Sequence, residues 1–303
     1  MLIISWNVNS IKVRMEQLLW MIDDMSPDVI LLQELKCADM AFPYDALINH
    51  PQASKYNVVV YGQKTYNGVA ILSKRMILES QKYNFATTAL HEAIAANGKS
   101  NGKGSSSGSN GPIGNGGDDT VENNQVEQIT EARYIEAVIP YDDQSTMRIG
   151  SVYVPNGSEV KSPKFRYKLA FYDEMRNHML KLLQQDEMVV IGGDLNVAPE
   201  AIDVYDPIGM DGTLAFHPEE RRRFRQMISD GYRDSFRFHR PDQQEFSWWD
   251  YRDRNSLRSN RGMRIDHLLV SPTVADLMVQ ANIHKDFRAM MRPSDHAPVG
   301  IVF

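Results

Sequence analysis

The stretch Ile191-Gly192-Gly193-Asp194-Leu195-Asn196 is the starting point for interpreting this chain. Residues 187–191 form a short run rich in apolar and β-branched side chains, which is typical of a buried strand. The two glycines let the backbone bend, and Asp194 and Asn196, two positions apart, point their side chains the same way. This arrangement suits holding a water molecule or a phosphate at a strand end, although an ordinary strand-to-turn transition uses the same residue types.

The composition of the chain excludes several classes of protein. With 303 residues and 42% hydrophobic side chains, the chain can build a sizeable core. No apolar run approaches the roughly 20 residues that span a bilayer, and the first residues lack a signal-type pattern. The single cysteine, Cys37, excludes internal disulfides and a multi-thiolate zinc site. We therefore expect a soluble, cytoplasmic protein that has no membrane partner.

Charge is distributed unevenly along the chain. The formal net charge is −6, which argues against a generic nucleic-acid coat protein. Residues 216–264, however, contain twelve arginines and no lysine against eight acidic residues. An acidic protein with one arginine-rich region can recognise phosphates locally, although some of these arginines are expected only to solvate a helix face.

Polar side chains follow several predicted strands at the points where the strands end. Asn7 follows the apolar run 2–6, and Glu34 closes the strand predicted for 28–34. The other strand-end residues are Tyr153, Asp194 with Asn196, Asp266, and Asp295 with His296. Each of these residues alone is a common strand-end cap. If all six strand ends converge at one edge, they form a cup of oxygen ligands with one histidine, which suits Mg²⁺ or Mn²⁺ better than zinc.

A segment of different composition interrupts this pattern at about residues 92–127. It is rich in Gly, Ser and Asn and has almost nothing apolar to bury, which predicts a disordered insertion. Gly98 and the Gly102-Lys103 pair lack the spacing and flanking elements of a phosphate-binding loop. Because predicted strands lie on both sides, the insertion is expected to interrupt a single domain that spans residues 1–303.

Predicted strands outnumber predicted helices, and many strands follow one another without a helix between them. Helices are predicted at 13–25, 165–184 and 218–230. This order predicts an α/β fold, a four-layer sandwich in which two packed mixed β-sheets are flanked by helices.

The sequence resembles the exonuclease III family of abasic-site endonucleases, within the endonuclease/exonuclease/phosphatase fold. The matching pieces follow the family order over nearly the whole chain outside the insertion. They are Ser5-Trp6-Asn7-Val8-Asn9-Ser10, Leu32-Gln33-Glu34-Leu35-Lys36, residues 62–70, Tyr153-Val154-Pro155-Asn156-Gly157, Gly192-Gly193-Asp194-Leu195-Asn196, Phe246-Ser247-Trp248-Trp249-Asp250-Tyr251-Arg252, residues 260–266 and Ser294-Asp295-His296-Ala297-Pro298. The pieces at 246–252 and 260–266 occur in far fewer members of the superfamily than the others, and they favour the DNA-repair branch.

The resemblance implies a role for each matching residue. Glu34 would bind a divalent metal with Asn7 close by, and Asp295 would lie beside a possible second metal position. His296, oriented by Asp266, would contact the scissile phosphate. The remaining implied roles are preparation of the attacking water by Asp194, phosphate positioning by Asn196, and stabilisation of the phosphate or the departing oxygen by Tyr153.

The resemblance also implies the substrate. Trp248, Trp249 and Met263 would line a pocket for an extruded abasic deoxyribose, with Met263 standing where we expect leucine. The implied activity is Mg²⁺-dependent hydrolysis of the phosphodiester 5′ to abasic sites in duplex DNA. 3′-to-5′ exonuclease and 3′-phosphodiesterase activities on 3′-blocked ends would accompany it, in a monomer. The alternatives are a phosphatase or phosphodiesterase of the same fold that acts on small or lipid phosphates, and a non-catalytic DNA-binding module.

Overall fold

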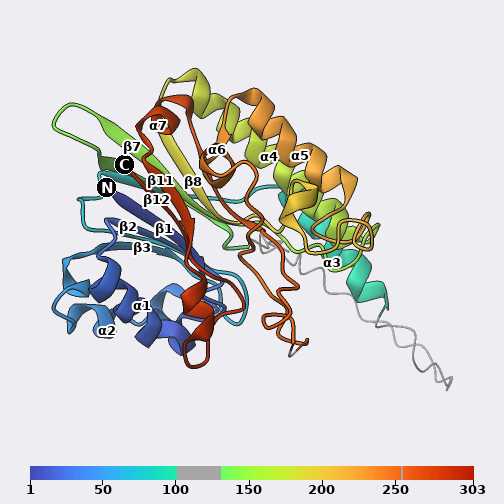
Figure 1. Ribbon diagram of the computed structural model, residues 1–303, viewed down its shortest axis with the longest axis horizontal. Coiled ribbons are helices and arrows are strands. Elements are labelled where there is room, and N and C mark those ends of the chain that lie inside the picture. Colours follow the sequence, from blue (N-terminus) through green and yellow to red (C-terminus); the bar gives the residue numbers. More distant parts are fainter. Residues whose placement is uncertain (101–130, 254) are drawn as a thin grey trace, which may run out of the picture.

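The structure is a computed structural model that describes residues 1–100, 131–253 and 255–303 (Figure 1). One six-stranded sheet has the order β11-β12-β1-β2-β4-β3. Its strands are β1 (Leu2–Asn7), β2 (Val29–Gln33), β3 (Asn57–Tyr61), β4 (Val69–Ser73), β11 (Gln280–Ile283) and β12 (Val299–Val302). Strands β1 and β2 are parallel because helix α1 (Ile11–Met25) connects them, whereas the other pairs are antiparallel.

The second six-stranded sheet has the order β5-β6-β7-β8-β10-β9. Its strands are β5 (Glu79–Tyr83), β6 (Tyr134–Pro140), β7 (Thr146–Tyr153), β8 (Met188–Asp194), β9 (Arg233–Asp234) and β10 (Asp266–Val270). Strands β7 and β8 are parallel and are joined by α4 (Pro163–Gln184), and the remaining pairs are antiparallel. Both sheets are therefore mixed, as the sequence predicts.

Three apolar layers hold the two sheets and their helices together. The layer between the sheets contains Leu31, Ile71, Ile149, Val190 and Leu268, all buried. A second layer packs the apolar stripe of α4 and part of α5 (Pro218–Asp230) against β7 and β8. A third packs α1 and α2 (Tyr44–Ile48) against the other sheet. Figure 1 shows these helix pairs on opposite outer sides of the sheets, so the predicted four-layer sandwich is confirmed.

The two glycines of the starting stretch are explained by this packing. A Cβ atom on Gly192 would lie 2.4 Å from Leu268 Cδ2 and 2.7 Å from Leu31 Cδ1, which belongs to the opposite sheet. A Cβ atom on Gly193 would lie 1.8 Å from the carbonyl oxygen of Val152 on β7. The glycines therefore allow the close approach of the sheets and strands that brings Asp194 into the site.

The prediction of disorder from residue 92 is wrong for the first residues of the insertion. Helix α3 spans Thr87–Ser100, and Leu90 in its first half is buried against the core on the α4 side. Ala, Leu and Ile residues at 89–96 give this segment a helix-forming composition that the glycines after it do not have. The rest of the predicted insertion, from residue 101, lies outside the described residues.

The remaining helices are short and were not predicted from the sequence. They are α6 (Ser235–His239), α7 (Pro272–Leu277) and 3₁₀ turns at Asp39–Ala41, Ala53–Lys55, Ala201–Asp203 and Lys285–Ala289. Among the helices of the described residues, none has the length and apolar character needed to cross a membrane.

Candidate active site

Strand pairing brings three of the predicted site residues together in one sheet. Tyr153 on β7 is paired in register with Asp194 at the end of β8. Asp266, the first residue of β10, is paired with Asp194 from the other side because β10 runs antiparallel to β8. The three side chains therefore begin from adjacent positions at one edge of the sheet.

The other sheet brings its own strand ends to the same place. Asn7 and Gln33 are paired in register on β1 and β2, so Glu34 follows directly beside Asn7. His296 lies in the segment before β12, and Trp6 Nε1 donates a hydrogen bond of 3.2 Å to its carbonyl oxygen. The expected convergence of the strand ends is thus present, and the site lies where the two sheets meet.

His296 is held by a carboxylate on one side and faces another on the opposite side. Its Nδ1 lies 2.9 Å and 3.0 Å from the two Asp266 oxygens, and Ser247 Oγ donates 2.6 Å to Asp266. Its Nε2 lies 3.7 Å from Asp194 Oδ2. Burial acts to lower the pKa of His296, but Asp266 and Asp194 outweigh burial and raise the pKa to about 10. The imidazole is therefore a cation near neutral pH.

Asp194 combines burial with a proton affinity suited to a base. Burial raises its pKa to about 7, with His296 acting in the lowering direction and Asp266 and Glu34 in the raising direction. The carboxylate accepts 2.9 Å hydrogen bonds from Asn7 Nδ2 and from the backbone N–H of Asn196. A carboxylate fixed in place with a pKa near 7 can accept a proton from water at neutral pH.

Glu34 supplies the second carboxylate of a possible metal site. One ligand atom each from Glu34, Asp194 and His296 lies within 4.8 Å of the other two. Because His296 is held protonated, the two carboxylates are the better donors, and oxygen donors suit a hard divalent cation. Lys36 Nζ lies 2.9 Å from Glu34 Oε2 and partly neutralises this carboxylate. The donor set fits a divalent cation bound through oxygen.

Asn7 hydrogen-bonds to both carboxylates of the site. Its Nδ2 donates 3.0 Å to Glu34 Oε1 and 2.9 Å to Asp194 Oδ2, and its Oδ1 accepts from the N–H of Asn9. The side chain is fully buried behind the two carboxylates. Asn7 therefore orients the two acidic groups, one from each sheet.

Asp295 lies beside the three grouped residues and is held by other partners. Asn9 Nδ2 donates 2.8 Å to one of its oxygens, and Trp248 Nε1 donates 3.1 Å to the other. Burial acts to raise the pKa of Asp295, but His296 and these two hydrogen bonds lower it below its ordinary value. Asp295 is thus an ionised residue at the rim, and it connects Trp248 to Asn9.

Tyr153 and Asn196 are held in place by neighbouring groups. Burial, together with Glu34, raises the pKa of Tyr153 well above its ordinary value, so its hydroxyl remains a donor. Asn196 Nδ2 donates 2.9 Å to the carbonyl of Val154. The fully buried Lys168 donates 2.8 Å to the carbonyl of Asn196 and forms an ion pair with Glu220, which secures this loop to α4 and α5.

These groups open into a cavity of about 410 Å³ that has a polar wall and an apolar wall. The polar wall contains Glu34, Asp194, Asn196, Asp295 and His296. The apolar wall contains Trp248, Met263, Leu214, Ala215 and Ile265. Two of the three predicted pocket residues, Trp248 and Met263, are therefore in the cavity lining.

Trp249 does not lie in this lining. Its side chain is 1% exposed and packs in the layer between the sheets, and its Nε1 donates 3.3 Å to Asn260 Oδ1. Neighbouring residues in an extended segment point to opposite sides, so only one of the two tryptophans can face the cavity. The structure therefore corrects the expectation that both tryptophans line the pocket.

Sequence reasoning missed several residues that orient the site. Asn9, Ser247 and Lys168 each hold a predicted site residue in place, and Leu214 and Ala215 extend the apolar wall. Asn9 and Ser247 lie within the quoted motifs, which is a signal that was available. Lys168 carries no such signal, because its helical position gives no indication that its amine is buried.

The arginine-rich region is partly structural. Arg264 is 1% exposed and paired with Asp203 and Asp234, while Arg223 pairs with Asp173 on α4. Arg252 pairs with Asp250 at 3.1 Å but, by contrast, is highly exposed and is part of the cavity lining. Only part of the local positive charge is therefore free to meet a phosphate.

Comparisons with known proteins agree with this geometry. Residues 4–296 match the Endonuclease/Exonuclease/phosphatase family. Exodeoxyribonuclease III of Haemophilus influenzae is 32% identical over 310 residues, which cover 99% of this chain and 98% of that protein.

Two solved structures share the fold over nearly their whole length. A 3′ phosphatase from Neisseria bound to a product DNA hairpin has a TM-score of 0.79 at 30% identity, with 100% of this chain and 99% of that chain covered. An AP endonuclease from Archaeoglobus fulgidus has the same TM-score at 25% identity and the same coverage. The chain therefore belongs to the endonuclease/exonuclease/phosphatase family, with exodeoxyribonuclease III among its relatives.

Proposed function

We infer that this protein is a DNA-repair nuclease that hydrolyses the phosphodiester 5′ to abasic sites in duplex DNA. The observation that carries the inference is a single cavity that unites the His296–Asp266 pair, Asp194 and Glu34 with the apolar wall at Trp248 and Met263. The relatives named for exonuclease, AP endonuclease and 3′ phosphatase activities support this reaction class. On the same grounds we propose 3′-to-5′ exonuclease and 3′-phosphodiesterase activities.

The proposed chemistry assigns one task to each polar group. Asp194, with its pKa near 7, accepts a proton from the water that attacks phosphorus. His296, held as a cation by Asp266, stabilises negative charge on the phosphoryl oxygens. Asn196 positions the phosphate, and the Tyr153 hydroxyl donates a hydrogen bond to the phosphate or to the departing oxygen.

Mg²⁺ is the proposed cofactor, and Mn²⁺ is an alternative. Glu34 would hold the ion with Asn7 close by, and Asp295 would lie beside a second position, while Asp194 keeps its role as the base. When bound, a divalent cation supplies positive charge that stabilises the phosphoryl oxygens.

The apolar wall supports an abasic site as the preferred substrate. A deoxyribose without its base leaves the duplex at low cost and fits a small cavity, whereas an extruded normal nucleotide brings a base that needs space and partners. Leu214 and Ala215 complete the wall formed by Trp248 and Met263. We further propose that the chain is one catalytic domain, because both sheets contribute to the site, and that it acts as a monomer, because one chain supplies every residue assigned to the reaction.

Incubation of the purified protein with duplex DNA that bears one abasic analogue tests the reaction. We expect incision 5′ to the lesion with Mg²⁺ and none with a chelator. Glu34→Ala should raise the Mg²⁺ concentration needed for half-maximal rate, whereas Glu159→Ala, on an exposed loop outside the cavity lining, should not. Incision that persists in the chelator would contradict the metal assignment.

Trp248 distinguishes DNA repair from hydrolysis of small phosphates. Trp248→Ala should lower abasic-site incision by about tenfold or more, since stacking-type contacts contribute roughly 1–3 kcal/mol. Hydrolysis of bis(p-nitrophenyl) phosphate should fall much less, because the polar wall is unchanged. Trp248→Phe keeps an aromatic ring but loses part of the indole surface and the hydrogen bond to Asp295, so its incision rate should lie between those of wild type and Trp248→Ala. Equal losses on both substrates would favour the phosphatase alternative.

A further inference from the structure

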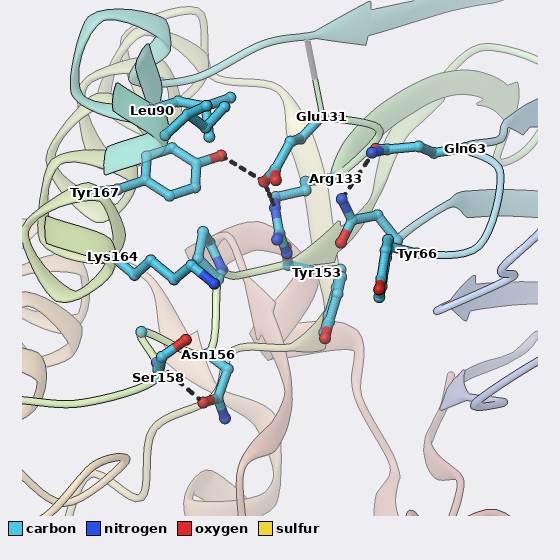
Figure 2. Close-up of a pocket in the computed structure, with 14 residues that line it drawn as sticks. Gln63, Tyr66, Leu90, Glu131, Arg133, Tyr153, Asn156, Ser158, Lys164 and Tyr167 are labelled. Carbon is cyan, nitrogen blue, oxygen red and sulfur yellow. Dashed lines mark hydrogen bonds and ion pairs between the residues drawn. The ribbon is translucent and has the colours of Figure 1, made fainter. Parts of the chain in front are cut away.

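A second cavity, of about 320 Å³, adjoins the candidate active site (Figure 2). The two cavities share Tyr153, Asn156 and Ser158 in their linings. Asn156 Nδ2 donates 3.2 Å to Asn196 Oδ1, so it connects the second cavity to the proposed phosphate position. A chain molecule whose phosphate occupies the first cavity can therefore continue into the second.

The floor of the second cavity is polar, and its positive and negative side chains pair with each other. Arg133 forms an ion pair with Glu131, and Tyr167 donates 3.1 Å to the same carboxylate. The guanidinium of Arg133 lies 4.8 Å from the centre of the Tyr153 ring, and its Nη1 donates 3.3 Å to the Tyr153 carbonyl. These contacts fix the wall that the two cavities share.

The sides of the cavity present apolar and aromatic surface. Leu90 and Ile94 on α3 form one side, and Ile94 is 39% exposed. Tyr66, on the loop after β3, is 67% exposed and offers its ring from another side. Next to this ring, Asn67 Nδ2 donates 2.9 Å to Gln63 Oε1, so an amide pair borders the aromatic surface.

Lys164 adds positive charge to this otherwise balanced surface. It lies in the first turn of α4, is exposed, and extends toward the cavity in Figure 2. Among the ion pairs of the described residues, none involves Lys164, so its charge remains available to an anionic ligand. An aromatic ring, a hydrogen-bonding amide edge and a cation are the features that bind single-stranded nucleic acid.

We propose that this second cavity binds an unpaired nucleotide that adjoins the scissile phosphate. The proposal rests on the proposed nuclease function and adds a binding site for DNA whose end is not base-paired. The base stacks on Tyr66 and against Ile94, and its phosphate faces Lys164. The volume of about 320 Å³ is at the lower end of small-ligand pockets, which suits one nucleoside.

The test compares two DNA substrates in three variants. One substrate is a duplex with two mismatched nucleotides at a 3′ end, and the other is the same duplex fully paired. Tyr66→Ala should raise KM for the mismatched end by about tenfold, the order that loss of one base–aromatic stack gives. Lys164→Glu places a negative charge where a phosphate is proposed and should raise the same KM by about tenfold, and both variants should change KM for the paired end little. Lys161→Glu, an exposed lysine three residues away and outside the cavity lining, makes the same charge change as a control.

A binding measurement separates this proposal from the nuclease function. Fluorescence anisotropy of a labelled single-stranded oligonucleotide, in the presence of a chelator, reports affinity without cleavage. We expect both variants to bind about tenfold more weakly than wild type and Lys161→Glu to match wild type, with circular dichroism to check folding. Variants that bind like wild type and show no preference between paired and mismatched ends would overturn the proposal, whereas a wild type that cuts no DNA would overturn the nuclease function.

Discussion

Two buried groups of charged residues lie at the beginning of the same strand, β10. They differ in how their carboxylates pair with a cationic side chain. We call them the His296 cluster, formed by His296, Asp266, Asp194 and Glu34, and the Arg264 cluster, formed by Arg264, Asp203 and Asp234. In the Arg264 cluster, Nε lies 2.7 Å from Asp203 and Nη2 lies 2.7 Å from Asp234. In the His296 cluster, one imidazole faces the carboxylates of Asp266 and Asp194, with Glu34 close by.

The direction of the carboxylate pKa shifts follows from this difference in ion pairing. Burial acts to raise the pKa of Asp203, but Arg264 outweighs burial and lowers it, and the same holds for Asp234. At Asp194 burial is not outweighed, and its pKa rises to about 7. The guanidinium offers five donors in a fixed fork, whereas the imidazole offers two. The carboxylates paired with the guanidinium stabilise the fold. Asp194, whose burial is not offset by its partners, lies beside the cavity and is available to accept a proton.

The largest expected effect concerns Asp194. Asp194→Asn should lower kcat for abasic-site incision by about 10²–10⁴-fold, the usual contribution of a general base. The midpoint of thermal unfolding should change little, because the side chain keeps its size and most of its contacts. Steady-state incision kinetics and calorimetry on Asp194→Asn and on the exposed Asp242→Asn measure both quantities. Near wild-type turnover in Asp194→Asn would show that another group activates the water.

Arg264 should show the reverse pattern, with stability as the main loss. Arg264→Met removes the arginine shared by the buried Asp203 and Asp234, leaving only Arg237 beside Asp203 and His267 beside Asp234, and should lower the free energy of unfolding by about 3–5 kcal/mol. Arg264→Lys keeps the charge without the fork and should lose less. Urea unfolding compares both with Arg258→Met, an exposed arginine. If Arg264→Met and Arg258→Met unfold at the same urea concentration, the cluster does not stabilise the fold.

The Arg264 cluster should also make the protein sensitive to acid. Asp203 and Asp234 have folded pKa values below their ordinary value of 3.8, so the unfolded state binds more protons in acid. Their contribution to stability is complete above the unfolded pKa and declines as pH falls, over about pH 5 to 2. Urea midpoints measured across this range should fall less steeply for Asp203→Asn than for wild type. A parallel decline in both proteins would remove Asp203 as a source of the acid sensitivity.

The smallest effect is expected outside both clusters. Replacing residues 104–127 with a short Gly/Ser linker should change stability by less than about 1 kcal/mol, because the cost of closing a loop depends weakly on its length. Abasic-site incision should remain near wild type, since the polar groups assigned to the chemistry all lie outside the replaced segment. Loss of cooperative unfolding in this variant would show that the segment packs against the fold.

The local pattern of the sequence was enough to predict the two mixed sheets, the helices α1, α4 and α5, and the polar residues at the strand ends. Alternating or continuous apolar runs mark strands independently of their partners, and the quoted motifs add Asn7, Glu34, Asp194, Asp266 and His296. The main error was the prediction of disorder at residues 92–100, which belong to helix α3. The glycine-rich sequence that follows obscured this helix. Most of the candidate site residues could therefore be predicted from the sequence.

Only the tertiary structure decided how these residues work together. The amide of Asn7 donates a hydrogen bond to Asp194, which lies 187 positions away in the sequence. The residues next to Asn7 in the sequence do not indicate that its amide orients two carboxylates. The choice of Trp248 over Trp249 for the cavity depends on which side of an extended segment faces it, and the Arg264 cluster depends on three distant segments meeting. Burial, which raises the pKa of Asp194, is likewise a property of the assembled sheets. Sequence patterns report local periodicity and residue chemistry, whereas distances, burial and charge balance arise when segments far apart in the chain pack together.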